Sequence, residues 1–207
     1  MRTVFSFIFF ICVVNVQAQT GIKLIDPNKT RGMSVMAALN ERQSIREYSS
    51  EELEMQDLSD LLWAANGINR PNGMRTAPST RNLQAVEIYV AFSNGIFHYD
   101  HNEHALKWVI TGDFRDAVAA SQEYVKTAPL CILLVANMNK FGNLDENSKM
   151  FAAIDVGIVS QNISIACSAF GLATVPRGIM DNEKLKTALK LSDMHLLLLN
   201  HPVGYPK

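Results

Sequence analysis

Apolar residues follow a helical spacing in some segments of this chain and an alternating spacing in others. The clearest helical pattern places four apolar side chains on one face, at Leu58, Leu61, Leu62 and Ala65. A capping-box pattern at Ser49 predicts that this helix begins near residue 49, and Gly67 stands where it would end. Similar patterns predict further helices at residues 34–40, 113–126, 146–170 and 182–190.

Strand patterns lie between these helices. Residues 86–92 alternate, residues 93–95 have turn composition and residues 96–99 return, which predicts a β-hairpin. The apolar run at 130–135 predicts a buried strand, and a last short strand is predicted at 196–199. Residues 146–170 form the longest apolar helical segment. We therefore expect a mixed alpha and beta fold with this helix at its centre.

The N-terminus has the pattern of a secretory signal. Arg2 precedes an apolar run at residues 4–14, which is shorter than the roughly 20 residues that a bilayer requires, and Ala18 follows at a typical cleavage position. The pattern predicts a signal peptide over residues 1–18 and one domain over residues 19–207. Because no cysteine stands just after residue 18, we expect an exported, periplasmic protein without a lipid anchor and without membrane insertion after cleavage.

Composition excludes several classes of function. The chain has 19 Lys and Arg residues, 20 Asp and Glu residues and no basic stretch, so nucleic acid is not expected as a partner. It contains neither a G-x-G-x-x-G sequence after a strand nor a P-loop lysine motif. No nucleophile or acid–base pair stands out, so we assign no catalytic side chain.

The cysteines and histidines have ordinary structural explanations. Cys131 and Cys167 lie in apolar segments without basic neighbours and are expected in the core, although a disulfide between them stays open at this point. His98, His101 and His104 fall in a strand-to-loop context that does not place them on one face. We therefore expect no metal site.

Two polar clusters carry the candidate chemistry. In the first, at residues 42–46, the guanidiniums of Arg42 and Arg46 flank Ser44, which suits a phosphate monoester because arginine offers a planar fork of donors at any relevant pH. The second, at residues 78–84, supplies hydroxyls and amides that suit the ribityl chain and pyrimidine edge of a flavin. Each cluster alone is typical of a turn or a helix entry. Together they predict a site for flavin mononucleotide (FMN).

The order of these clusters resembles the FMN-dependent nitroreductase superfamily. The resemblance also rests on Gly-Leu-Ala-Thr-Val-Pro-Arg-Gly-Ile at residues 171–179 and on Gly-Tyr-Pro at residues 204–206. Residues 95–106 are similar to the branch that includes SagB-type dehydrogenases. The resemblance implies an α+β, nitroreductase-like fold, with an antiparallel sheet flanked by helices around a long central helix. It further implies an intertwined homodimer with FMN at the subunit interface.

The resemblance also implies which residues bind the flavin. One subunit would contact the phosphate, ribityl chain and pyrimidine edge through Arg42, Gln43, Ser44 and Arg46. The facing subunit would contribute Pro78, Ser79, Thr80 and Asn82, with Gln84 behind them. A basic position of the family that reaches the phosphate matches Lys207.

A third segment would lie against flavin N5, where hydride is accepted. It consists of Pro176, Arg177 and Gly178, with the backbone N–H groups of Arg177 and Gly178 directed at N5 and O4. The positive charge of Arg177 leads to the hypothesis that the acceptor is anionic, so that an Arg177→Ala variant would lose such an acceptor selectively.

The function implied is an FMN-dependent oxidoreductase. Electrons would pass in two ping-pong half-reactions through flavin N5 to a small organic acceptor such as a nitroaromatic or a quinone. The family commonly uses NADH or NADPH as donor, whereas export favours a different donor. Two alternatives stay open: a peptide-azoline dehydrogenase, and a flavin-binding or structural dimer without turnover.

Overall fold

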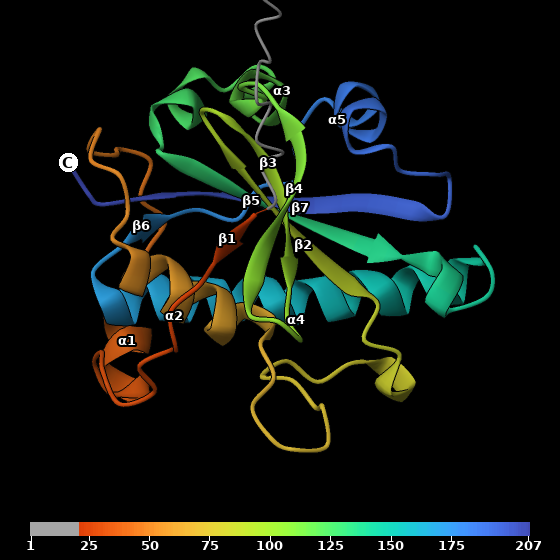
Figure 1. Ribbon diagram of the computed structural model, residues 1–207, viewed down its shortest axis with the longest axis horizontal. Coiled ribbons are helices and arrows are strands. Elements are labelled where there is room, and N and C mark those ends of the chain that lie inside the picture. Colours follow the sequence, from red (N-terminus) through yellow and green to blue (C-terminus); the bar gives the residue numbers. More distant parts are fainter. Residues whose placement is uncertain (1–20) are drawn as a thin grey trace, which may run out of the picture.

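An antiparallel sheet of seven strands forms the middle of the protein (Figure 1). The computed structural model describes residues 21–207, so the predicted signal peptide lies outside the described residues. Across the sheet the strands follow the order β1-β4-β3-β2-β5-β7-β6. Their bounds are β1 (Ile22–Lys23), β2 (Val86–Phe92), β3 (Gly95–Asp100), β4 (Ala105–Thr111), β5 (Leu130–Asn137), β6 (Ala173–Thr174) and β7 (His195–Gly204).

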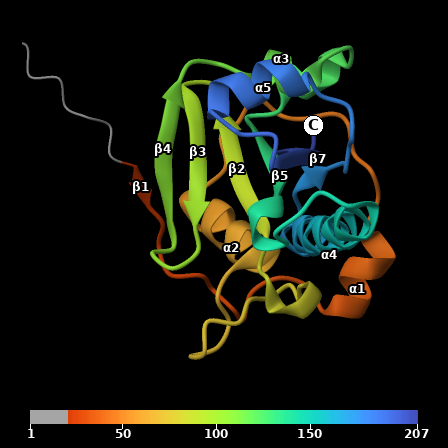
Figure 2. The same ribbon diagram turned by 90° about the vertical axis from the view of Figure 1, so that its right-hand side faces the viewer.

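Helices pack on both faces of this sheet (Figure 2). The α-helices are α1 (Val35–Glu41), α2 (Met55–Asn66), α3 (Arg115–Ala119), α4 (Glu146–Phe170) and α5 (Asn182–Leu189). Three short 3₁₀ helices are η1 (Thr80–Asn82), η2 (Glu123–Thr127) and η3 (Met138–Lys140). Helices α2 and α4 cover one face, and α3 and α5 cover the other.

The sequence of strand β5 is an uninterrupted apolar run because both faces of the strand are buried. Ile132 and Leu134 pack into the core beneath α2 and α4, while Leu133 and Val135 pack into the core beneath α3 and α5. A strand covered on both faces has no polar side. Cys131 belongs to the second core and Cys167 to the first, so the sheet separates the two thiols and both are free. This arrangement excludes the disulfide.

Helix α4 is the long central helix that the sequence predicts. It begins after Asp145, whose side chain accepts a hydrogen bond from Ser148 N at 2.7 Å, and it ends at Gly171 in the left-handed conformation. By length and composition it is apolar enough to cross a membrane, yet half of its most apolar stretch is buried within the protein. The remaining apolar residues face outward, with Met150 and Ile154 each 50% exposed.

The α+β class and most elements agree with the prediction. The structure confirms α1, α4, α5, β5 and the β2–β3 hairpin close to the predicted bounds. The predicted start of α2 is wrong, because Ser49 Oγ accepts a hydrogen bond from Glu51 N instead of capping a helix, and α2 begins at Met55. The single helix predicted at 113–126 is also wrong, since Ala120 with φ of 50° separates α3 from η2.

Two further differences concern strands. Strand β4 was not predicted, and its Trp108 is 42% exposed. Strand β7 is ten residues long and continues through Pro202, whereas the sequence indicated only residues 196–199. Its full length matters for the site, because β7 pairs with β6 and holds the strip at Arg177 through Asn200.

Candidate active site

The arginine cluster, residues 42–46, is an exposed segment that directly follows α1. Arg42 is the C-cap of α1, and the predicted flavin-binding side chains here are all exposed: Arg42, Gln43, Ser44 and Arg46. Ile45 N–H donates to Thr174 O in β6 at 3.0 Å, and the Tyr48 hydroxyl donates to Ile45 O at 3.0 Å. The backbone at Ile45 is therefore fixed while the side chains on either side point to solvent.

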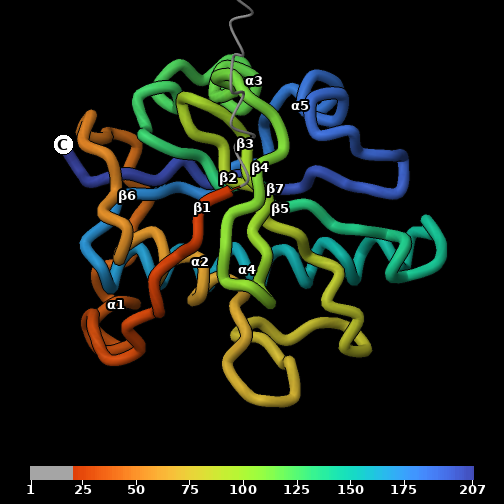
Figure 3. The backbone as a smooth tube through the Cα atoms, viewed as in Figure 1, coloured from red at the N-terminus to blue at the C-terminus, as the bar shows by residue number. Residues whose placement is uncertain are grey.

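The C-terminal segment runs beside the same region (Figure 3). Tyr48 forms an isolated bridge with Pro206, and Ser49 N–H donates to Tyr205 O at 2.8 Å. Lys207 follows as an exposed residue. The structure thus brings residues 42–46 and the end of the chain together in one protomer.

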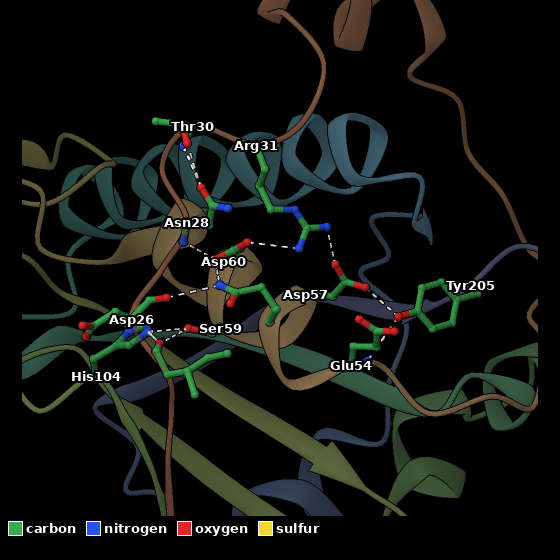
Figure 4. Close-up of polar contacts among 12 residues, drawn as sticks. Asp26, Asn28, Thr30, Arg31, Glu54, Asp57, Ser59, Asp60, His104 and Tyr205 are labelled. Atoms are coloured by element: carbon green, nitrogen blue, oxygen red, sulfur yellow. Dashed lines mark hydrogen bonds and ion pairs between the residues drawn. The ribbon is translucent and has the colours of Figure 1, made fainter.

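A network of charged groups holds this region onto α2 (Figure 4). Tyr205 OH donates to Asp57 Oδ2 at 2.6 Å, and Arg31 forms ion pairs with the buried carboxylates of Asp57 and Asp60. The segment that carries Arg31 continues into α1 and the arginine cluster. Buried carboxylates need a cation or hydrogen-bond donors, so this network fixes the C-terminal segment and the approach to α1 together.

The strip at residues 176–178 lies along β7. Arg177 and Asn200 exchange two backbone hydrogen bonds, of 2.9 and 2.7 Å, so the prediction that Arg177 N–H points at flavin N5 was wrong. Gly178 N–H has no acceptor within residues 21–207. A Cβ built at Gly178 would meet only Leu198 O, at 3.8 Å, so packing inside the protein does not require this glycine. The space there suits close approach by a ligand.

The Arg177 side chain is buried and turns away from solvent. Its guanidinium donates to Asn200 Oδ1 at 2.6 Å, to Gln122 Oε1 at 2.7 Å, and to the carbonyls of Val118 and Ala119 at 3.1 Å each. These carbonyls end α3, so the side chain acts as a cap for that helix. The hypothesis that Arg177 selects an anionic acceptor required a positive charge accessible to the acceptor. This requirement is not met, because the guanidinium is buried.

We expect an Arg177→Ala variant to lose stability rather than acceptor selectivity. Removing a buried guanidinium leaves several polar groups without partners, which typically costs about 3 kcal/mol or more. Urea unfolding of the variant measures this loss, and an Arg70→Ala variant at an exposed arginine serves as control. Unchanged stability together with a selective loss of anionic acceptors would restore the original hypothesis.

Residues 78–84, which the resemblance assigns to the facing subunit, are held by a buried carboxylate on α4. Asp155 is 2% exposed and accepts hydrogen bonds of 3.0 Å from both the N–H and the hydroxyl of Thr80. Just beyond, the backbone φ angles of Arg81, Asn82 and Gln84 are 50°, 56° and 50°. Left-handed residues other than glycine are strained, so the anchor at Asp155 holds a loop that would otherwise relax.

The side chains of this segment support one another. Ser79 Oγ accepts from Gln84 N at 2.9 Å, and Gln84 Nε2 donates to Asn82 Oδ1 at 3.2 Å. Gln84 thus contacts the side chain of Asn82 directly. Pro78 and Asn82 are exposed.

Within one chain the two clusters lie at opposite ends of α4 (Figure 1). Residues 78–84 attach at Asp155, while the arginine cluster lies beside Ser168, whose hydroxyl donates to Ala38 O at 2.8 Å. At 1.5 Å rise per residue these attachment points are roughly 20 Å apart. One protomer therefore does not bring all the predicted flavin residues together.

A buried histidine joins α4, β6 and β7 beneath the arginine cluster. His201 is fully buried, with Nε2 2.7 Å from Ser160 Oγ and Nδ1 3.2 Å from Thr174 Oγ1. The Thr174 hydroxyl donates its proton to Pro202 O, so Nδ1–H of His201 donates to Thr174 and Nε2 accepts from Ser160. This arrangement needs a neutral imidazole, and burial lowers the pKa of His201 to about 3.

We expect His201 to make the protein less stable at acid pH. Between pH 7 and pH 5 the unfolded chain protonates this histidine, with a pKa near 6.5, while the folded chain does not. Stability therefore falls by about 2 kcal/mol over this interval. A His201→Gln variant should lose that contribution in urea unfolding at the two pH values. A His195→Gln variant is the control, and an unchanged pH dependence in His201→Gln would contradict the assignment.

The other histidines form no metal site within residues 21–207. His104 lies between Ser59 Oγ and Tyr99 OH, at 2.7 and 2.9 Å, whereas His101 contacts Arg75 and His98 packs against Tyr89. The three side chains thus have separate partners.

The exposed donors of the arginine cluster fit a flavin phosphate and its polar chain. Within residues 21–207 the guanidiniums of Arg42 and Arg46 form no ion pair, and the side chains of Gln43 and Ser44 form no hydrogen bond. A cavity of about 210 Å³ adjoins them, lined in part by Gln43, Ile45, Thr174 and Pro206. Two unpaired cations beside a hydroxyl and an amide suit a phosphate monoester.

The model of the nitroreductase family matches residues 39–205. The chain belongs to the nitroreductase family. This membership supports an oxidoreductase of the flavin type.

Two of the relatives that carry the name "putative nitroreductase" match most of this chain. One, from Methanocaldococcus jannaschii, is 28% identical over 176 residues, which cover 80% of this chain and 88% of that protein. The other is a crystal structure from Ralstonia eutropha JMP134, with 32% identity, a TM-score of 0.85, and coverage of 94% of this chain and 92% of that one. Nitroreductase A from Vibrio parahaemolyticus is 20% identical with a TM-score of 0.63, over 84% of this chain and 69% of that one, and shows the shared fold.

Sequence reasoning missed the residues that support the site. Asp155 is a single polar residue within the apolar pattern of α4, and Asn200 and His201 are adjacent, fully buried polar residues in β7. Isolated polar residues at helical core positions give a signal, since buried polar groups need partners, but the sequence does not reveal which partners they have.

Proposed function

We propose that this nitroreductase-family protein is an FMN-dependent oxidoreductase. The observation that carries the proposal is the unpaired, exposed arginine pair, Arg42 and Arg46, around Ser44 on a backbone segment fixed at Ile45. Family membership supports the same conclusion. The proposed cycle has two ping-pong half-reactions, in which a donor delivers electrons and leaves before the acceptor binds.

When bound, the flavin supplies the redox chemistry. Arg42 and Ser44 would hold the phosphate and ribityl chain, with Lys207 near the phosphate. Arg46 would place positive charge near the pyrimidine edge, where the reduced ring carries negative charge, and so would raise its reduction potential. Gly178 would allow the ring to approach and would offer its free N–H at the N5 edge.

We also propose a homodimer in which each flavin lies between two subunits. The outer face of α4 presents an apolar stripe that includes Met150, Ile154 and Ile165, and Met36 on α1 is 75% exposed. Gly157 lies on the same stripe, and an added Cβ there would meet nothing within 4 Å. A mid-helix glycine costs about 1 kcal/mol, so a glycine that the chain itself does not need suits close packing of a second helix.

The position of this stripe would allow a composite site to form in the proposed dimer. The attachment points of the two clusters, Asp155 and Ser168, lie on either side of Gln161, which is exposed on the stripe. A twofold axis near Gln161 would bring residues 78–84 of one subunit to the arginine cluster of the other. A single chain lacks this arrangement, so the dimer would complete the site.

The acceptor we propose is a small organic molecule such as a nitroaromatic or a quinone. We further propose that the protein acts after export, because residues 1–18 have the pattern of a secretory signal. A neighbour from Clostridium acetobutylicum, 25% identical with a TM-score of 0.58 over 82% of this chain and 87% of that one, carries the name "putative NADH oxidase". NADH therefore belongs among the donors to be tested, beside a quinol.

The test is the visible absorption spectrum of the protein after incubation with FMN and removal of the excess. We expect about one flavin per subunit, bleached by a donor and restored by a nitroaromatic or a quinone. A colourless protein that takes up no FMN would contradict the proposal. Bound flavin without turnover would favour the non-catalytic dimer, and turnover only with an azoline peptide would favour the dehydrogenase alternative.

A further inference from the structure

A polar cavity of about 610 Å³ lies where β2 and β3 separate. The two strands pair from Phe92 and Gly95 at the hairpin turn as far as Tyr89 and His98. Beyond that point β2 continues beside β5, and β3 continues beside β4, as Figure 1 shows. The cavity thus occupies a gap within the sheet, and both strands and the loop at residues 72–75 line it.

Arg75 lines this cavity and is 8% exposed. One terminal nitrogen lies 2.6 Å from His101 Nε2 and the other donates to Val86 O at 3.4 Å, while Nε has no partner within residues 21–207. No carboxylate in this range forms an ion pair with Arg75. A void of about 10 Å³ beside it has room for at most one water. One water would satisfy an N–H group but would leave the buried charge uncompensated.

The charges around the cavity favour a ligand with one negative charge. Arg75 and the exposed Lys140 are cations, and Glu87 is the acidic lining residue. The Glu87 carboxylate already accepts from Asn137 Nδ2 at 2.7 Å and from Tyr89 OH at 3.2 Å. His101 is neutral, because arginine has only donors and Nε2 must therefore accept. One net positive charge remains.

We propose that this cavity binds a hydrophilic monocarboxylate, with its carboxylate held by Arg75 and Lys140. The rest of the ligand would face side-chain amides, which can pair with hydroxyl groups as donors and acceptors. These amides belong to Asn72, Asn82, Gln84 and Asn102. The volume suits a small molecule. The site does not depend on the proposed flavin chemistry, although Asn82 and Gln84 also belong to the predicted facing-subunit set.

Isothermal titration calorimetry with a matched set of six-carbon probes tests this proposal. Gluconate has the charge and the hydroxyls, sorbitol has the hydroxyls alone, and hexanoate has the charge alone. We expect saturable binding of gluconate at least tenfold tighter than that of the other two. Inorganic phosphate, titrated beside them at neutral pH, should bind more weakly than gluconate. Equal binding of all probes, no saturable binding, or tighter binding of phosphate would overturn the proposal.

Two variants locate the binding site. Arg75→Gln should weaken gluconate binding at least tenfold, as expected for loss of charge-assisted hydrogen bonds. Because Arg75 is buried, that variant is checked by thermal unfolding, and the exposed Lys140→Met variant should weaken binding about threefold without affecting the fold. Lys149→Met, at a lysine paired with Glu146 on α4, is the control. The assignment would be overturned if both Lys140→Met and Arg75→Gln bound gluconate as tightly as the unaltered protein. FMN retention, measured in parallel, tests the separate flavin proposal.

Discussion

Replacing Arg42 and Ser44 together by alanine should strip FMN from the purified protein. A charge-assisted hydrogen bond contributes roughly 1.5–3 kcal/mol and a neutral one roughly 1 kcal/mol, so we expect affinity to fall at least about 100-fold. The fold should be unaffected, because the backbone at Ile45 is held by Thr174 and Tyr48 and both altered side chains are exposed. Absorbance near the flavin maximum after gel filtration measures the retained cofactor.

The matched control replaces Lys149 and Ser50, which also removes one cation and one hydroxyl from the surface. This control should retain flavin fully. If the Arg42 and Ser44 variant held FMN as tightly as the control, the phosphate would lie elsewhere, and residues 42–46 would be no more than an exposed turn after α1.

Replacing Ile154 by arginine should convert the protein from a dimer to a monomer. The side chain is 50% exposed in one chain, so the protomer tolerates the charge, but a twofold interface along α4 would bury an unpaired charge from each subunit. Because residues 78–84 and 42–46 come from different subunits in the proposed site, FMN should be lost with the dimer. Light scattering and the visible spectrum, read on the same sample, test both steps.

Trp108→Arg is the control for this experiment. Trp108 is 42% exposed on β4, so the variant adds the same charge at an apolar surface position that is not on α4. A dimeric Ile154→Arg protein would contradict the interface along α4. A monomer that keeps its flavin would instead contradict the composite site.

Sequence patterns predict the elements with strong local signals. Helix α4 combines an acidic N-cap at Asp145, a long apolar pattern and Gly171 in the left-handed conformation, and its bounds agree with the prediction. Strand β5 is apolar throughout because helices cover both of its faces. The start of α2 is different, because Ser49 pairs with the C-terminal segment, and a contact so distant along the chain leaves no local pattern.

The candidate site likewise combines residues that the sequence predicts with residues whose roles depend on distant contacts. The polar side chains of residues 42–46 are exposed and take no part in the core, so they stand out in the sequence as a polar cluster. The role of Arg177 is not visible in the sequence, since only the packed structure brings its guanidinium to the end of α3. Asp155 and His201 likewise depend on partners 75 and 41 residues away, respectively.

Strand β7 sets the alignment of one half of the site. Asn200 fixes the strip at Arg177, His201 supports Thr174 beneath the arginine cluster, and Tyr205 continues from the same strand to α2. These three attachments lie within six consecutive residues, at the end of β7 and directly after it, so their spacing is fixed by one short stretch of backbone. The opposite half is a strained loop attached through Thr80 to a single carboxylate. In the proposed dimer, adjustment to acceptors of different shape would therefore fall to the partner's loop, and substrate range could vary there without disturbing the position of the flavin ring.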